Sequence, residues 1–133
     1  MRKILFIEDD PDQIFLYDTY FRVKAPDMLL IVASNEYEAL RFMHEDNPQF
    51  ILADILLNGE NGLDIVEKIK SDPQFKDVPV VIFTNFDRKE ERERARKLGA
   101  LDYLLKTKVM PEELLKKMRG YEESKIPSET IAP

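Results

Sequence analysis

Residues 2–24 read RKILFIEDDPDQIFLYDTYFRVK, and this stretch decides the fold class. Its apolar run at residues 3–7 is continuous and does not alternate with polar residues, which is typical of a strand buried on both faces of a parallel sheet. Asp10 and Pro11 are typical N-cap and first-turn residues of a helix, and apolar side chains then recur near helical spacing as far as Lys24. The stretch therefore predicts a strand, an acidic loop and a helix, in that order.

The strand and helix unit recurs along the rest of the chain. Further apolar runs are expected to form strands over residues 28–32, 50–53, 78–83 and 103–105. Helices are expected between and after them: one that Asn35 caps and Asn47 ends, one over residues 62–69, one over residues 88–98 that Asp87 and Glu90 cap, and one that Pro111 opens. The alternation predicts an α/β fold, an open parallel sheet with helices on both faces.

The composition indicates one globular domain and excludes several classes of protein. The 133 residues carry a net charge of -6, which is the wrong sign for a general nucleic-acid binder and favours a cation or a basic partner. The absence of cysteine excludes disulfides and thiol catalysis, and the single histidine excludes a multi-histidine metal site. No apolar run approaches the roughly 20 residues of a membrane span. We expect a cytoplasmic protein without nucleic-acid or membrane partners. Its domain is expected over residues 1–121, followed by a flexible tail over residues 122–133.

Polar side chains follow the predicted strands at the points where the strands end. Because the carboxyl ends of parallel strands meet at one edge of the sheet, where ligands bind, these side chains are expected to converge. They are Glu8, Asp9 and Asp10 after the first run, Asp54 after the third, Thr84 after the fourth and Lys106 after the fifth.

This set of side chains is suited to phosphoryl chemistry. Clustered carboxylates without histidine or cysteine favour a hard cation such as Mg²⁺, which keeps open positions for phosphoryl oxygens. Lys106 and Thr84 can neutralise a transferring phosphoryl group, and a carboxylate that the metal does not use can be the nucleophile. Asp54 is the natural candidate for that nucleophile.

Four segments together resemble the receiver (CheY-like) domain of two-component response regulators, here as a stand-alone domain. The segments are FIEDDP, ILADILLNGENG, VIFTN and GALDYLLK, and the resemblance covers residues 2 to about 120. It implies a flavodoxin-like (βα)5 three-layer sandwich whose five-stranded parallel sheet has the order 2-1-3-4-5. It also implies a role in phosphorelay signal transduction.

The resemblance assigns roles to the residues at the edge of the sheet. Asp54 corresponds to the phosphoacceptor, which receives a phosphoryl group from the phosphohistidine of a sensor histidine kinase or phosphotransfer protein. Asp9 corresponds to a direct ligand of Mg²⁺, with Mn²⁺ as the alternative ion, and Glu8 to a residue that acts mainly through a bound water. The backbone carbonyl of Leu56 corresponds to a third contact. The chain is then a phosphoacceptor that assists its own phosphorylation and dephosphorylation, and not an enzyme.

The resemblance also implies a conformational switch. Thr84 and Lys106 correspond to the pair that holds the phosphoryl oxygens, and Tyr103 to an aromatic residue that swings inward as Thr84 moves. The surface of the fourth helix, fifth strand and fifth helix would then bind a downstream protein. The chain itself would be a monomer or a phosphorylation-dependent homodimer. Leu56 and Phe86 occupy positions that tune hydrolysis, and because both are apolar we expect a long-lived phosphorylated state.

Three residues depart from the family pattern, and two other functions compete. Thr107 follows Lys106 where a proline with a cis peptide is usual, Asn85 stands in place of a small residue, and Asn58 in place of a proline. One alternative is a receiver fold that binds partners without phosphorylation. The other is a phosphatase of the haloacid dehalogenase type, in which Asp10 would be the nucleophile.

Overall fold

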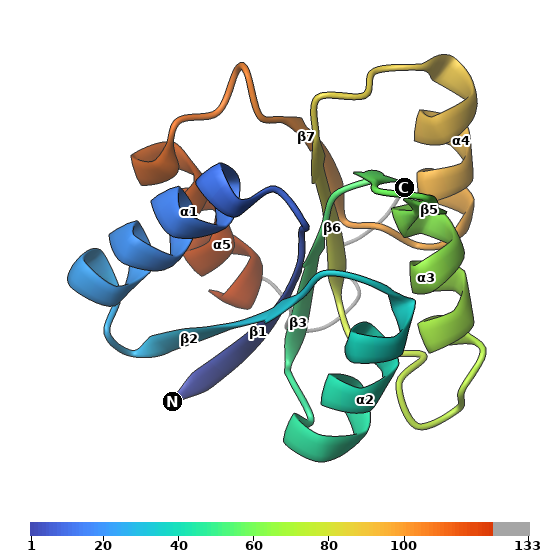
Figure 1. The fold of residues 1–133 in the computed structure, drawn as a ribbon, viewed down its shortest axis with the longest axis horizontal. Helices are drawn as coiled ribbons and strands as arrows, with labels where there is room; N and C mark the ends of the chain where they lie inside the picture. The colour runs from blue at the N-terminus through green and yellow to red at the C-terminus, as the bar shows by residue number, and fades with distance from the viewer. Residues whose placement is uncertain (124–133) are drawn as a thin grey trace.

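The computed structural model describes residues 1–123, which form a sheet of five parallel strands between two layers of helices (Figure 1). The strands of the main sheet are β1 (Arg2–Ile7), β2 (Met28–Ala33), β3 (Phe50–Ala53), β6 (Val80–Thr84) and β7 (Asp102–Leu105). Their spatial order is β2-β1-β3-β6-β7, so β1 and β3 are the centre of the sheet. In order of the main strands this is 2-1-3-4-5, and the predicted flavodoxin-like fold is confirmed.

The helices divide between the two faces of the sheet. Their bounds are α1 (Pro11–Lys24), α2 (Glu36–Asp46), α3 (Gly62–Lys70), α4 (Lys89–Lys97) and α5 (Pro111–Glu123). Figure 1 shows α1 and α5 on one face and α2, α3 and α4 on the other. Adjacent residues of β1 point into different cores: Phe6 packs with Tyr17 and Phe21 of α1, whereas Leu5 packs in the core of α2 and α3. This explains why the strands read as continuous apolar runs.

Local sequence signals place most helix ends correctly. Asn35 Oδ1 accepts a hydrogen bond from the N–H of Glu38, and Asn47 ends α2 in the left-handed conformation with φ 48°. Asp10 Oδ1 accepts from the N–H of Asp12 at 3.0 Å and caps α1, where Pro11 is the first residue. These caps are the ones that the sequence predicts.

The predicted cap of α4 is wrong. Arg88, and not Asp87, is the N-cap residue, and it makes no side-chain capping hydrogen bond. The Asp87 carboxylate instead pairs with the guanidinium of Arg92 at 2.7 Å. An acidic side chain before a helix can bond either to backbone N–H groups or to a nearby cation, and here the cation is preferred.

α4 has a weak connection to the core. Ala95 is its single buried residue. Arg94 reaches from α4 to α3, where it forms ion pairs with Asp64 at 2.7 Å and Glu67 at 2.8 Å. α4 therefore buries little apolar surface of its own, and Arg94 adds charged contacts that connect it to α3 at the surface.

Two further features differ from the predicted organisation. A short antiparallel hairpin, β4 (Leu56–Leu57) and β5 (Glu60–Asn61), lies between β3 and α3 and was not predicted. α5 continues through Glu123, so the first two residues of the predicted tail are helical, and the remainder of that tail lies outside the described residues. Within residues 1–123, none of the helices combines the length and the apolar character that a bilayer crossing requires.

Candidate functional site

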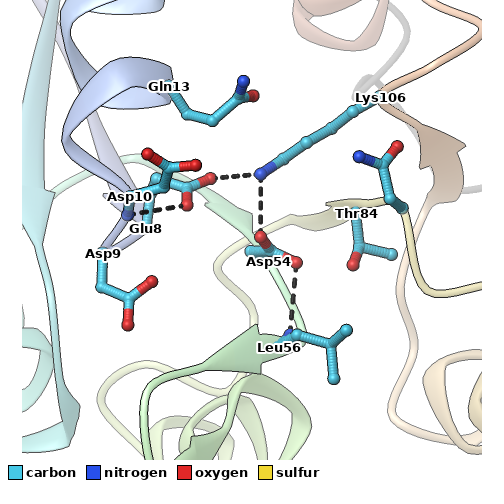
Figure 2. Close-up of a pocket in the computed structure, with 9 residues that line it drawn as sticks. Glu8, Asp9, Asp10, Gln13, Asp54, Leu56, Thr84 and Lys106 are labelled. Carbon is cyan, nitrogen blue, oxygen red and sulfur yellow. Dashed lines mark hydrogen bonds and ion pairs between the residues drawn. The ribbon is translucent and has the colours of Figure 1, made fainter.

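A pocket of about 300 Å³ opens beyond the carboxyl ends of the central strands (Figure 2). Its walls are formed by Glu8, Asp9, Asp10, Gln13, Asp54, Leu56, Thr84, Asn85 and Lys106. All six polar residues that the sequence places at the strand ends are therefore brought together. This edge of the sheet is also where the strand order reverses, which is the usual ligand position in such folds.

Asp54 lies at the centre of the pocket, directly after β3, with 6% of its surface exposed. Its backbone N–H donates to the carbonyl of Ile7 at 3.0 Å, which extends the pairing of β3 with β1. Its Oδ1 accepts a hydrogen bond from the N–H of Leu56 at 3.3 Å, and its Oδ2 lies 2.8 Å from Nζ of Lys106. The carboxylate is therefore held at both oxygens and faces the pocket.

Lys106 bridges two buried carboxylates. Its ammonium donates to Asp54 and, at 2.5 Å, to Oε1 of Glu8, and its side chain is 7% exposed (Figure 2). Burial alone would lower the pKa of Lys106, but the carboxylates of Asp54 and Glu8 outweigh it and raise the pKa above its usual value. Burial raises the pKa of Glu8, against the lowering effect of Lys106. Lys106 is therefore a charged group at neutral pH, positioned beside the candidate acceptor.

The three consecutive acidic residues have three different environments. The buried Glu8 contacts Lys106 and also accepts from the N–H of Asp10 at 3.1 Å. The Asp9 carboxylate accepts a hydrogen bond from the backbone N–H of Asn58, at 2.5 Å. The Asp10 side chain is exposed and is used as the cap of α1. Asp10 is therefore a poor candidate for a nucleophile.

The oxygen donors suit a hard divalent cation. No three His, Cys, Asp or Glu side chains within residues 1–123 form a ready cluster for a metal. Lys106 bonds to both Glu8 and Asp54, and Asp9 bonds to Asn58. Mg²⁺ does not require such a cluster, since it commonly uses one or two carboxylates and keeps several waters. Asp9 and Asp54 line the same pocket with Leu56, so the donor set fits this ion.

Thr84 and Tyr103 meet at the backbone of Phe86. Thr84 is fully buried, and its hydroxyl oxygen accepts from the N–H of Phe86 at 3.2 Å, while the Tyr103 hydroxyl donates to the carbonyl of Phe86. Arg92 lies 4.5 Å from the centre of the Tyr103 ring and pairs with Asp87. Burial raises the pKa of Tyr103 to about 12. Phe86 thus links the residue in the pocket to the residue beside α4.

The departures from the family pattern have structural explanations. No cis peptide bond occurs in residues 1–123, so Lys106–Thr107 is trans, and Lys106 reaches Asp54 nevertheless. The Asn85 side chain bonds to the loop after β7, where its Oδ1 accepts from the N–H of Thr107 at 2.9 Å. Asn58 begins the turn of the β4–β5 hairpin and contributes its N–H to Asp9.

The sequence analysis missed one residue of the pocket. Gln13, in the first turn of α1, lines the pocket, and its Oε1 is buried without a hydrogen-bond partner among the described residues. Its position one helical turn after Asp10 is the signal that could have identified it. Of the two residues expected to tune hydrolysis, Leu56 lines the pocket with 54% of its surface exposed, while Phe86 packs against the core beside α4.

Comparison with known proteins assigns the class. The family model of the response regulator receiver domain matches residues 4–119. The chain therefore belongs to the response regulator receiver domain family, as the four segments of its sequence predicted. The match rules against the haloacid dehalogenase alternative, and the capping role of Asp10 agrees with that outcome.

Individual relatives cover nearly the whole chain. It is 27% identical to protein PilH of Pseudomonas aeruginosa over 88% of this chain and 93% of PilH. Its structure resembles the BeF3-activated N-terminal receiver domain of Klebsiella pneumoniae RstA, with a TM-score of 0.76, 30% identity, and coverage of 89% of this chain and 96% of that chain. The fold is also that of the Mn(2+)-bound form of response regulator Rcp1, with a TM-score of 0.75, 24% identity and full coverage of both chains.

Proposed function

We propose that this receiver domain accepts a phosphoryl group on Asp54 from the phosphohistidine of a sensor histidine kinase or phosphotransfer protein. The observation that carries the proposal is the Lys106 ammonium, which lies 2.8 Å from the Asp54 carboxylate in a pocket open to a partner. A buried lysine beside a buried carboxylate at the end of β3 has no evident purpose in packing. It is well placed to contact a phosphoryl oxygen as the acyl phosphate forms.

The proposed transfer exchanges a phosphorus–nitrogen bond for a phosphorus–oxygen bond. A carboxylate oxygen of Asp54 forms a bond to phosphorus as the phosphorus–nitrogen bond of the phosphohistidine breaks. The electron pair of that bond returns to the imidazole nitrogen of the partner, which then binds a proton. Lys106 remains protonated throughout, because its raised pKa favours the ammonium form, and it moves from neutralising Asp54 to neutralising the phosphoryl group.

Mg²⁺, with Mn²⁺ as the alternative, is the proposed cofactor. Asp9, Asp54 and the backbone carbonyl of Leu56 would hold it, with Glu8 acting through a bound water. When bound, the ion supplies positive charge that stabilises the equatorial oxygens of the transferring group. The oxygen-only donor set of the pocket and the Mn(2+)-bound form of Rcp1 support this assignment.

Phosphorylation is proposed to change the surface of α4, β7 and α5, which would bind an unidentified downstream protein as a monomer or a phosphorylation-dependent homodimer. The support is the contact of Thr84 and Tyr103 with the same residue, Phe86. A Thr84 side chain that rotates toward a phosphoryl oxygen would carry its hydroxyl oxygen away from the N–H of Phe86. The backbone that receives the Tyr103 hydroxyl would then be free to shift.

The test is the intact mass of the protein after incubation with acetyl phosphate, with and without Mg²⁺. The parent and the matched control Asp10→Ala are expected to gain one phosphoryl group in a Mg²⁺-dependent reaction, and Asp54→Ala to gain none. Asp10→Ala is a suitable control because it removes a carboxylate from the same pocket without touching the acceptor. A parent that gains no mass would favour a phosphorylation-independent interaction module.

A further inference from the structure

The hairpin of β4 and β5 contacts Asp9, which is one of the proposed metal ligands. The backbone N–H of Asn58, the first residue of its turn, donates to Oδ2 of Asp9 at 2.5 Å. These residues are 49 positions apart in the chain. Hydrogen bonds that a carboxylate accepts are stronger than those between neutral groups.

The donor has a fixed position. It is a main-chain group, so it cannot change rotamer, and it lies between two strands that are paired with each other. The hairpin is also attached to the start of α2, where Oε1 of Glu60 accepts from the N–H of Glu36 at 2.8 Å. The hairpin can therefore hold the Asp9 side chain against rotation.

The contact joins two segments that carry proposed ligands of the metal. Asp9 follows β1, and Leu56 lies in β4 two residues before Asn58, while the side chains of Asp9 and Leu56 line the same pocket. Oδ2 of Asp9 accepts from Asn58, which leaves its other oxygen for a cation. Carboxylate ligands are commonly oriented by hydrogen bonds of this kind, and loss of such a partner weakens metal binding.

From this geometry we infer that the Asn58 N–H is a positioning group for the divalent cation, which holds Asp9 at a fixed distance from the Leu56 segment. This inference rests on the proposed function, because it concerns the same metal site. The competing interpretation is a turn contact that stabilises the hairpin only. Metal affinity distinguishes the two, because a contact of the second kind changes the stability of the fold and leaves the affinity unchanged.

The turn allows a substitution that removes the backbone N–H of Asn58. Gly59 has a φ of +79°, whereas Asn58 is not among the residues of positive φ, so the pair fits a turn that accepts proline at its first central position. The preceding residue, Leu57, is in a strand, which proline also tolerates. Asn58→Pro therefore removes the N–H without straining the backbone, and Asn58→Ala is the matched control that keeps it.

The experiment is calorimetric titration of the full chain with MgCl2. The parent and Asn58→Ala are expected to bind Mg²⁺ with equal affinity, and Asn58→Pro roughly tenfold more weakly. Thermal unfolding in a chelator shows that each variant is folded before titration. If Asn58→Pro does not fold, Glu60→Ala, which removes the acceptor of the hydrogen bond from the N–H of Glu36 and so loosens the hairpin at α2, is titrated in its place with a weaker affinity expected.

The outcomes separate this inference from the proposed function. A parent that binds Mg²⁺, together with an Asn58→Pro variant of equal or tighter affinity, overturns the inference alone. A parent that fails to bind Mg²⁺ overturns the proposed metal site and the inference with it. Weaker binding by Asn58→Pro but not by Asn58→Ala supports it.

Discussion

A Cβ atom placed on Gly62 would lie 1.8 Å from the backbone carbonyl oxygen of Asp54. The first residue of α3 is therefore pressed against the segment that carries the candidate phosphoacceptor. The same glycine donates its N–H to the carbonyl of Ile55 at 2.7 Å. No side chain larger than hydrogen fits here without movement of the Asp54 backbone.

Gly62→Ala is expected to lower the free energy of unfolding by at least about 3 kcal/mol, because the clash is with backbone and cannot be relieved by a rotamer change. Urea denaturation measures the effect. Gly120→Ala is the control: its new Cβ would meet nothing within 4 Å, and since it lies inside α5 it should stabilise the protein by roughly 0.5–1 kcal/mol. Similar unfolding curves for parent and Gly62→Ala would contradict the prediction.

The lifetime of the phosphorylated state should depend on Leu56 and Phe86. Neither side chain has a polar atom that could orient an attacking water, so Leu56→Asn and Phe86→Glu are each expected to accelerate loss of the phosphoryl group several-fold. The measurement is the decay of the phosphorylated mass after removal of acetyl phosphate. Leu56→Val, which stays apolar at the same position, should decay like the parent, and slower decay in the polar variants would refute the idea.

Tyr103→Phe should reduce stability by about 1 kcal/mol, because the hydroxyl donates to the carbonyl of Phe86. Burial raises the pKa of Tyr103 from 10.0 to about 12, so its neutral form is the one that the fold favours. The stabilisation is complete below pH 10 and is lost as the pH rises toward 12. Urea denaturation of both proteins across this range tests it. Tyr37→Phe, at a residue that is 70% exposed, should have no effect.

Asp27 is expected to give stability that disappears in acid. Its carboxylate accepts from both terminal nitrogens of Arg119, at 3.0 and 3.1 Å, and this contact lowers its pKa from 3.8 to about 2. The contribution is present above pH 3.8 and is lost as the pH falls through about 2. The melting temperature of Asp27→Asn should therefore lie below that of the parent at pH 5 and converge with it near pH 2. A gap that is constant over this range would exclude the contact as its cause.

The fold was accessible from the sequence because each strand is a short apolar run and each helix has a local signal at its start. Asn35 and Asp10 cap the helices that they were expected to cap, and the side-chain oxygen of each accepts from a backbone N–H of the first turn. Asp87 does not cap α4 as predicted, because the guanidinium of Arg92 binds its carboxylate. That choice depends on the relative position of two exposed side chains, which spacing in the sequence does not determine.

The sequence predicts which residues line the site, but not the hydrogen bonds that they form. Topology alone brings Glu8, Asp54 and Lys106 to one edge of the sheet. The bond between Asn58 and Asp9 and the bond between Thr107 and Asn85 each join residues that lie far apart in sequence, and each depends on which backbone N–H groups the loops leave unpaired. The β4–β5 hairpin, with two residues in each strand, is too short for a period to be recognised.

The sparse burial of α4 should make the proposed output surface of α4, β7 and α5 sensitive to salt. Arg94 is the bridge from this helix to α3, through two exposed acidic partners, and dissolved ions screen such contacts over a distance of about 8–10 Å. The attachment of α4 to α3 through these ion pairs should therefore weaken as the salt concentration rises. The displacement of α4 that phosphorylation is proposed to cause should then be larger at high salt than at low salt.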